Sequence, residues 1–345
     1  MPIPIASLLA ARDWYPQISE DGKVSQPLRF IDLDGEIPHD LSDLAHRVCV
    51  LIGITRNPTA HTHQLAQLFD LTLTDVATDA AAGDEAFVVV PNIDQAMSQL
   101  IESTQNFARA AMTLGSTLRL TSQLTTADAI AAEASAYSTL LAGPEFARWL
   151  SSRSTKKVTP TNEIERVLTS ITGNTLNIRM NRKLRLNAID GAMRAGLVDA
   201  FSIALADPTL NVLLTGDGPC FSNGGDLREF GTTPDPSTAW TVRMTQHPGW
   251  YLSQISDRAT AHVHGKCIGA GVEMPAFATR VIADPATTFH LPELSMGLIP
   301  GAGGCVSIPA RIGRWRSLWM VLSGSTLTAD EALAWGLIDD IAPIN

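Results

Sequence analysis

The sequence predicts an α/β protein with a large C-terminal body and a smaller N-terminal part. Strand-like and helical stretches alternate after residue 163, two β-branched runs occur before residue 91, and apolar residues make up 45% of the 345 residues. Alternating strands and helices are typical of layered α/β folds. A chain of this length and apolar content has room for one large core plus roughly 100 to 150 further residues.

The N-terminal part is expected to begin with strands and to continue with helices. Residues 47–54 (RVCVLIGI) and 86–90 (AFVVV) are short, rich in β-branched residues and flanked by turn formers, which indicates buried strands. Residues 93–114 and 126–141 contain few breakers and predict helices. Thr125 or Thr126 can cap the second helix, and Pro144 fits the first turn of a third.

A polar, basic and proline-containing segment, residues 153–162 (RSTKKVTPTN), follows these helices. It predicts a linker between an N-terminal extension, residues 1–152, and a core, residues 163–345. Within the core we expect strands at residues 175–180, 211–215 and 259–264 and a helix at about 189–205. These elements give the core its α/β pattern.

Charge and cysteine content exclude several classes of protein. A net charge of -10 and a pI near 5.2 offer no general electropositive surface, so neither nucleic acid nor a membrane is an expected partner, and an anionic ligand requires a local basic patch. The four cysteines form no CxxC pair, which predicts buried, reduced thiols. The N-terminus lacks the pattern of a secretory signal, so we expect a cytoplasmic, soluble protein.

Three segments carry residues suited to chemistry. Residues 211–230 are an apolar strand that ends in a Gly-rich turn, where backbone N–H groups can approach a ligand. Residues 261–274 are a strand followed by small residues and a helix start, which exposes N–H donors to a developing oxyanion. Residues 289–304 bring a second carboxylate on a proline-containing loop. Each signal is weak alone, but their order is informative.

Four motifs carry a family resemblance. They are N-R-x-x-x-x-N-A at residues 181–188, F-S-x-G-x-D at 221–226, G-x-G-x-E at 269–273, and P-E-x-x-x-G-x-x-P-G-A-G-G at 292–304. In this order they resemble the enoyl-CoA hydratase/isomerase, or crotonase, superfamily over about residues 157–341. The resemblance implies a crotonase-like ββα spiral core, with an additional N-terminal α/β segment in this chain.

The resemblance also implies the site. Glu273 and Glu293 are the expected catalytic acid and base, and the N–H groups of Asn223 and Ala270 are the expected oxyanion hole for the thioester carbonyl. No metal or redox cofactor is implied, coenzyme A being part of the substrate, and a homotrimer or hexamer is expected. The residues expected to contact the substrate or its CoA are Arg185, Ala188, Phe221, Gly224, Gly225, Asp226, Gly269, Pro300 and Gly301.

Some positions depart from the family pattern. Lys183 stands where proline usually follows Asn-Arg, Pro275 follows closely after Glu273, and Asn223 replaces a small residue. Asn223 can turn inward to bind a polar acyl group or can be an exposed turn residue. His262 and His264 share a face of a predicted strand without a third metal ligand, so core or hydrogen-bonded histidines are the better interpretation.

The N-terminal half resembles the end of the same family. Residues 88–104 and 125–152, including an E-x-x-x-Y-x-x-L pattern from Glu133, look like its closing helices, whereas the core stops soon after the stretch 330–341. We therefore expect a permuted or fused chain in which residues from about 85 to 152 supply those helices. Residues 1–84 are then a degenerate second crotonase unit or a separate cap. An unrelated helical domain is the alternative.

The expected function is addition of water to a 2-enoyl-CoA thioester, or its elimination. The resemblance implies this because the family's hydratases keep both glutamates, whereas its isomerases usually keep only the second. Other reactions at the same oxyanion hole remain as alternatives: isomerisation, acyl-CoA hydrolysis and cofactor-independent oxygenation. A non-catalytic subunit that binds acyl-CoA is the alternative from a different class.

Overall fold

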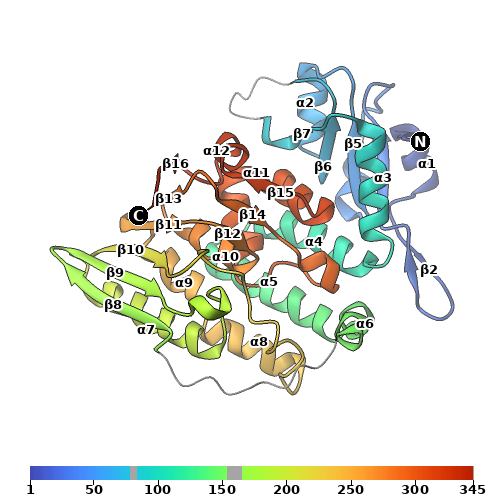
Figure 1. Ribbon diagram of the computed structural model, residues 1–345. Coiled ribbons are helices and arrows are strands. Elements are labelled where there is room, and N and C mark those ends of the chain that lie inside the picture. Colours follow the sequence, from blue (N-terminus) through green and yellow to red (C-terminus); the bar gives the residue numbers. More distant parts are fainter. Residues whose placement is uncertain (78–83, 154–164, 345) are drawn as a thin grey trace.

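The computed structural model describes residues 1–77, 84–153 and 165–344. It confirms an α/β fold with a C-terminal core and an additional N-terminal α/β unit, which occupies the blue and cyan part of Figure 1. Apart from Arg153, which follows the last N-terminal helix, the predicted linker at residues 153–162 lies outside the described residues. The proposed division into domains therefore stays a prediction.

The core contains a six-stranded sheet with the order β16-β13-β11-β10-β9-β8. Its strands are parallel except for the antiparallel pair β8 and β9. The strands predicted at 175–180, 211–215 and 259–264 are confirmed as β9, β10 and β11. The six strands are β8 (Val167–Thr172), β9 (Thr175–Met180), β10 (Asn211–Gly216), β11 (Ala259–Val263), β13 (Arg280–Ala283) and β16 (Asp340–Ile341).

A smaller sheet, β12-β14-β15, places the two candidate catalytic glutamates. Its strands are β12 (Lys266–Ile268), β14 (Thr288–His290) and β15 (Thr326–Thr328). Strands β12 and β14 are parallel, and Ile268 pairs with His290. Glu273 and Glu293 follow these paired ends, so both side chains begin at the same edge of the sheet.

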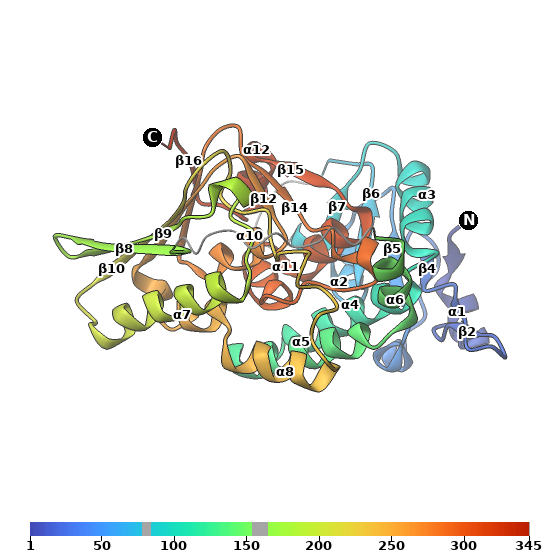
Figure 2. The same ribbon diagram turned by 60° about the horizontal axis from the view of Figure 1, so that its bottom comes forward.

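The helices of the core lie around these sheets (Figure 2). Helix α11 is interrupted at Gly313, whose φ is 76°. The core helices are α7 (Gly191–Ala206), α8 (Pro236–Thr245), α9 (Pro248–Ser253), α10 (Ala270–Glu273), α11 (Gly304–Ser323) and α12 (Ala329–Trp335). The short 3-10 helices of the whole chain are η1 (Ser42–His46), η2 (Asp84–Ala86), η3 (Lys183–Arg185), η4 (Ser256–Arg258), η5 (Pro275–Phe277) and η6 (Glu293–Met296).

The N-terminal unit is a five-stranded parallel sheet with the order β1-β4-β5-β6-β7. The strands predicted at 47–54 and 86–90 are confirmed as β5 and β7. Its elements are β1 (Ile3–Pro4), α1 (Ile5–Ala11), the hairpin β2 (Gln17–Ile18) and β3 (Val24–Ser25), β4 (Leu28–Asp32), β5 (Val50–Ile54), α2 (Ala60–Ala66), β6 (Leu71–Thr74) and β7 (Phe87–Val89).

Four helices connect this unit to the core: α3 (Ile93–Thr104), α4 (Ala108–Thr121), α5 (Thr126–Leu141) and α6 (Pro144–Ser152). The helix from 126 to 141, its Thr125 cap and Pro144 in the first turn of α6 are confirmed. The helical stretch predicted at 93–114 is divided into α3 and α4. Because the Glu145 carboxylate binds the amides of Arg109 and Ala110, a contact from α6 stabilises a new helix start there.

Helices α3 to α5 pack directly on the core. Gln99 donates to the carbonyl of Ser323 at 2.8 Å, and Thr121 donates to the carbonyl of Cys305 at 2.7 Å. The largest hydrophobic cluster contains buried residues of the N-terminal sheet, of these helices and of the core. The helices therefore share one continuous interior with the core.

A buried charge cluster also joins the two parts. Asp70, which is 1% exposed, accepts hydrogen bonds from Arg47 on both carboxylate oxygens and from Arg119 at 2.7 Å, and Arg314 of α11 lies 3.8 Å away. Burial opposes ionisation of Asp70, but the charges of Arg47 and Arg119 outweigh it and lower its pKa. Asp70 therefore anchors residues from the sheet, from α4 and from the core.

Candidate active site

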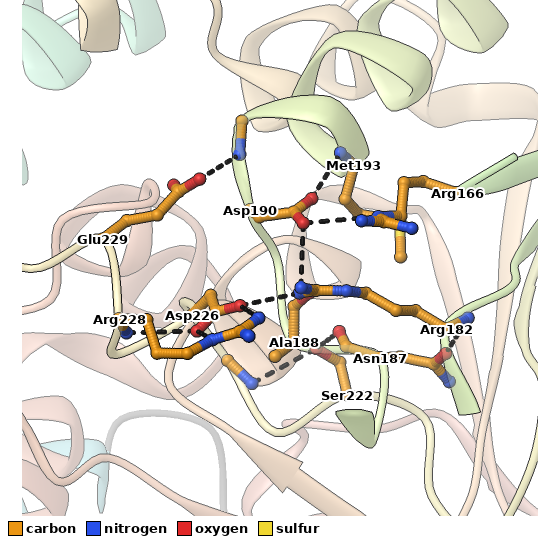
Figure 3. Close-up of polar contacts among 12 residues, drawn as sticks. Arg166, Arg182, Asn187, Ala188, Asp190, Met193, Ser222, Asp226, Arg228 and Glu229 are labelled. Atoms are coloured by element: carbon orange, nitrogen blue, oxygen red, sulfur yellow. Dashed lines mark hydrogen bonds and ion pairs between the residues drawn. The ribbon is translucent and has the colours of Figure 1, made fainter. Parts of the chain in front are cut away.

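The N-R-x-x-x-x-N-A motif builds a rigid base under the Gly-rich turn. Arg182 is 7% exposed and forms ion pairs of 2.9 Å with both Asp190 and Asp226, as Figure 3 shows. Burial opposes ionisation of Asp226, but hydrogen bonds from Arg228 and Arg182 outweigh it and hold its pKa well below the usual range. Asp226 thus stays charged, and its ion pairs fix the turn.

Asn187 holds the other side of this turn. Its side-chain amide donates to the carbonyls of Asp217, Cys220 and Phe221 at 2.7 to 3.1 Å, and its side-chain oxygen accepts from the amide of Arg182. Asn187 is fully buried and has a φ of 50°, which asparagine tolerates better than most residues. The motif therefore holds the turn that follows Phe221 in a fixed conformation.

One of the two expected oxyanion donors has an acceptor within the chain. The amide of Asn223 donates to the carbonyl of Leu186 at 2.8 Å, and its side chain is exposed. Of the four amides in residues 223–226, only that of Gly225 has no acceptor within the described part of the chain. Hydrogen bonding across the turn, which the motif does not encode, decides which of these amides is free, and the assignment of the oxyanion donor in this turn stays a prediction.

The amide of Ala270 is available, as expected. Ala270 opens α10, and its N–H has no acceptor among residues 1–77, 84–153 and 165–344. Gly224 lies beside it, since a Cβ added to Gly224 would be 3.6 Å from the Ala270 nitrogen. Gly225 and Ala270 both line one cavity, and neither amide has an acceptor among the described residues.

Glu273 and Glu293 converge on one point. A Cβ added to Gly269 would lie 2.6 Å from Oε1 of Glu293 and 3.9 Å from Oε1 of Glu273. Both side chains line the cavity and are 2% and 7% exposed. The structure therefore brings the two predicted catalytic residues together, as their place after paired parallel strands requires.

The two carboxyl groups differ in their surroundings. Oε2 of Glu273 accepts from the amides of Ala302 at 2.7 Å and Gly304 at 2.9 Å, whereas Oε2 of Glu293 is buried without a partner among the described residues. Burial raises the pKa of Glu273 to about 7, and the two amides limit that rise. Burial and the nearby Glu273 raise the pKa of Glu293 well above its usual value. Glu293 is thus the better holder of a proton.

A third buried carboxylate, Glu133 of α5, supports this loop. It accepts from the amides of Gly303 and Cys305 at 2.7 Å each, next to the amides that bind Glu273. Burial, and then the charge of Glu273, raise the pKa of Glu133 to about 8. Its only signal in the sequence was the pattern that begins at Glu133 in the closing-helix resemblance.

The far wall of the cavity comes from helices α5, α8 and α9. Tyr137 packs its ring against Gly301, because a Cβ there would lie 2.2 Å from the ring, and the Arg243 guanidinium lies 3.8 Å from the ring centroid. The Nδ1 atom of His247 accepts from the amide of Trp250, and burial lowers the pKa of His247 to about 4. His247 is therefore neutral near pH 7. The sequence did not predict Arg243 or His247 as site residues, because neither belongs to a recognisable motif.

Several residues expected to contact the substrate or CoA do not line this cavity. Phe221 is fully buried in the core, Pro300 is buried behind the loop, and the carbonyl of Ala188 accepts from Arg182 at 2.6 Å. Arg185 is exposed on η3 outside the cavity. Of the site residues expected from the sequence, those that line the cavity are Asn223, Gly224, Gly225, Asp226, Gly269, Ala270, Glu273, Glu293 and Gly301.

The other sequence features are accounted for by packing. His264 shares a hydrogen bond with the carbonyl of Gly218, and all four cysteines are buried and free. In the described residues no cluster of His, Cys, Asp and Glu has the form of a metal site. None of the helices described is both long and apolar enough to cross a bilayer.

Known proteins resemble the core of this chain. The 2,3-dehydroadipyl-CoA hydratase of Escherichia coli is 32% identical over 49% of this chain and 66% of its own length. The mevalonyl-coenzyme A hydratase of Beauveria bassiana is 32% identical over 49% and 63%. The chain thus spans just under two thirds of the length of each hydratase. The 1,2-epoxyphenylacetyl-CoA isomerase of Escherichia coli is 30% identical over 51% and 69%.

A solved structure and a family model each match about half of the chain. The crystal structure of enoyl-CoA hydratase from Thermoplasma volcanium has 31% sequence identity and a TM-score of 0.49, covering 52% of this chain and 73% of that one. The model of the enoyl-CoA hydratase/isomerase family matches residues 170–345, just over half of the chain. The resemblance stated from the motifs is confirmed, and the chain belongs to the enoyl-CoA hydratase/isomerase family.

Proposed function

We propose that this protein adds water to the double bond of a 2-enoyl-CoA, or removes it from the 3-hydroxyacyl product. The observation that carries the proposal is the pair Glu273 and Glu293, which face one point beside two unpaired amides but differ in their hydrogen bonding. Two hydratases among the relatives support it.

The chemistry follows from the position of each group. Ionised Glu273 accepts a proton from water as the water oxygen bonds to Cβ, and protonated Glu293 delivers a proton to Cα. Negative charge that develops on the thioester oxygen is bound by the amides of Gly225 and Ala270. Losing one such donor costs about 3 to 4 kcal/mol in comparable sites.

Double-bond isomerisation is the second candidate. It is favoured by Glu293, whose unpaired Oε2 can carry a proton from one carbon to another while Glu273 stays bound to two amides. The isomerase among the relatives belongs to the same family. Hydration is measured as a loss of absorbance, because it removes the double bond conjugated with the thioester. Isomerisation of a 3-enoyl to a 2-enoyl thioester instead increases this absorbance.

Single substitutions test the assignment. Glu273→Gln and Glu293→Gln are each expected to lower kcat for hydration by at least ~10²-fold, because general acid-base catalysis contributes about that much. Glu102→Gln on the exposed face of α3 is the control and should leave turnover unchanged. Wild-type hydration by the Glu273→Gln variant would remove Glu273 from the mechanism, whereas isomerisation without hydration in the wild type would favour the second candidate.

Helices α3 to α6 are proposed to be the closing helices of the family, placed before the core in this chain. Their packing on α11 and the place of Tyr137 in the cavity wall support this. A homotrimer or hexamer, a cytoplasmic location and the lack of a metal or redox cofactor stay predictions. Light scattering on the purified protein measures the first of these directly.

A further inference from the structure

Two arginines, Arg194 of α7 and Arg243 of α8, line the cavity that contains the glutamates. They belong to different helices. Burial lowers the pKa of Arg194, the charge of Glu229 opposes this, and the charge of Arg243 lowers it further. The cavity is about 250 Å³, which limits an acyl group to a short chain. Positive charge inside such a space is unusual, because pockets for small molecules are mostly apolar.

Neither arginine has a carboxylate partner. Within residues 1–77, 84–153 and 165–344, no Asp or Glu oxygen lies within 4.0 Å of either guanidinium, and the Nε atoms of both are buried without an acceptor. Arg243 donates to the carbonyl of Ala239 at 3.3 Å. Arginines elsewhere in the chain, such as Arg47 and Arg182, are paired with buried carboxylates.

The acidic groups around the two arginines have other partners. Glu273 and Glu133, which feel the charge of Arg243, accept from the amides at the start of α11. Glu229 accepts from the amide of Gly191 at 2.9 Å, and Asp190 forms ion pairs with Arg166 and Arg182. Both arginines are partly buried, and their Nε atoms are fully buried. Removing part of a cation from water without a partner carries a cost, so a site that keeps two such groups is suited to a ligand that brings negative charge. Planar guanidinium groups bind carboxylates with two parallel hydrogen bonds.

The position of Arg243 indicates which end of the substrate it contacts. The amides of Gly225 and Ala270 fix the thioester end, and Glu273 follows. Arg243 lines the same cavity, near enough to Glu273 for its charge to limit the rise in the pKa of that carboxyl, and lies over the ring of Tyr137. A short acyl chain that leaves the amides and passes Glu273 therefore ends near Arg243.

We propose that Arg194 and Arg243 bind a carboxylate at the end of the acyl chain, so that the substrate is a 2-enoyl-CoA of a short dicarboxylic acid. This rests on the proposed function. The phosphates of coenzyme A are a second source of negative charge for the same pair. The experiment must therefore distinguish a carboxylate on the acyl chain from these phosphates.

The test compares two substrates of equal length, trans-2-hexenedioyl-CoA and trans-2-hexenoyl-CoA, on the full chain. The wild-type kcat/KM is expected to favour the carboxylate-ended substrate by at least ~10-fold, as charged hydrogen bonds require. The preference should persist in the N-acetylcysteamine thioesters, which have no phosphate. A preference that vanishes there assigns the arginines to phosphate and overturns the proposal.

Variants then assign the preference to residues. Arg243→Met and Arg194→Met keep much of the apolar stem, and each is expected to reduce the ratio of the two kcat/KM values by at least ~10-fold. Arg148→Met, an exposed arginine of α6, is the matched control and should keep the wild-type ratio. If Arg243 only adjusts Glu273, both substrates lose turnover equally and the ratio stays constant, which contradicts the proposal.

A measurement on the wild type guards against variants that do not fold. Adipoyl-CoA is expected to inhibit at a concentration at least ~10-fold lower than hexanoyl-CoA, since only the former carries the second carboxylate. Equal inhibition constants would overturn the inference. Absence of turnover with both enoyl substrates would instead count against the proposed hydratase activity.

Discussion

Glu133 and Glu273 share the amides at the start of α11: Glu273 binds those of Ala302 and Gly304, and Glu133 binds those of Gly303 and Cys305. Two acidic groups thus meet the positive end of one helix, which favours negative charge. Because Glu133 comes from α5, the loop that holds a catalytic candidate depends on both halves of the chain.

The buried glutamates should make stability depend on pH. Burial raises the pKa of Glu133 to about 8 and that of Glu273 to about 7, above the ordinary 4.5. A raised pKa stabilises the folded protein fully below pH 4.5, and this contribution is lost as the pH rises towards 8. Glu133→Gln should therefore flatten the decline in unfolding free energy, by up to about 1.4 kcal/mol per pH unit. Urea unfolding from pH 5 to 8 measures both slopes, and parallel slopes would contradict the assignment.

The rate of hydration should show a bell-shaped pH profile. Glu273 must be ionised to accept a proton, so kcat/KM should rise through about pH 7. Glu293 must be protonated, and its pKa lies well above 4.5, so the rate should fall again on the alkaline side. Initial rates from pH 5 to 10 test this. A constant rate between pH 5 and 9 would exclude the two glutamates as the acid and the base.

Gly269→Ala should abolish turnover by displacing a carboxylate. The added Cβ would lie 2.6 Å from Oε1 of Glu293, at a residue whose φ is 51°. We expect kcat to fall by at least ~10²-fold, as when an acid-base group is lost. Gly173→Ala is the matched control, since its φ is 60° but nothing lies within 4 Å of the new Cβ. Similar losses of kcat in both variants would show that backbone strain, and not the carboxylate, is responsible.

Asp70→Asn should destabilise the contact between the N-terminal sheet and the core. The substitution leaves Arg47, Arg119 and Arg314 without their shared anion, and breaking a buried pair costs about 3 to 5 kcal/mol. Asp13→Asn removes a half-exposed partner of Arg29 and should cost less than about 1 kcal/mol. Chemical denaturation gives both values. Equal values would mean that the cluster does not stabilise the fold.

Dividing the chain tests whether the N-terminal helices complete the core. Residues 157–345 alone should be insoluble or inactive, because they lack Glu133 and Tyr137 and expose apolar surface that α3 to α5 cover. Residues 1–156 produced in the same cell should copurify with that fragment and restore activity. If the fragment 157–345 were soluble and active on its own, the N-terminal helices would not be needed to complete the core, and the proposal would be wrong.

Local patterns predicted most of the fold. Period and turn residues located β5, β9, β10, β11 and α5, because strand alternation and helix caps are properties of neighbouring residues. The break between α3 and α4 was missed because the group that stabilises it, Glu145, lies 36 residues away from Arg109. A contact of that range leaves no local signal.

The site was predicted in part for the same reason. Glu273, Glu293 and Ala270 follow strands whose motifs are recognisable, and the structure brings them to one cavity. The amide of Asn223, the predicted donor, binds the carbonyl of Leu186, whereas that of Gly225, two residues later, is unpaired among the described residues. The motif alone does not show this difference. The sequence did not predict Arg194 and Arg243 as site residues. What sets them apart is the lack of a carboxylate partner, and only the structure shows which side chains lie around an arginine.

The order of the halves affects how the protein is made. Glu133 precedes Gly303, the amide it binds, by 170 residues. At about 5 to 20 residues per second, the ribosome releases α5 roughly 10 to 30 seconds before that partner exists. During this interval the core surfaces that cover the apolar faces of these helices, and the amides that bind Glu133, have not yet been made. Chaperones are therefore expected to bind mainly the first half of the nascent chain.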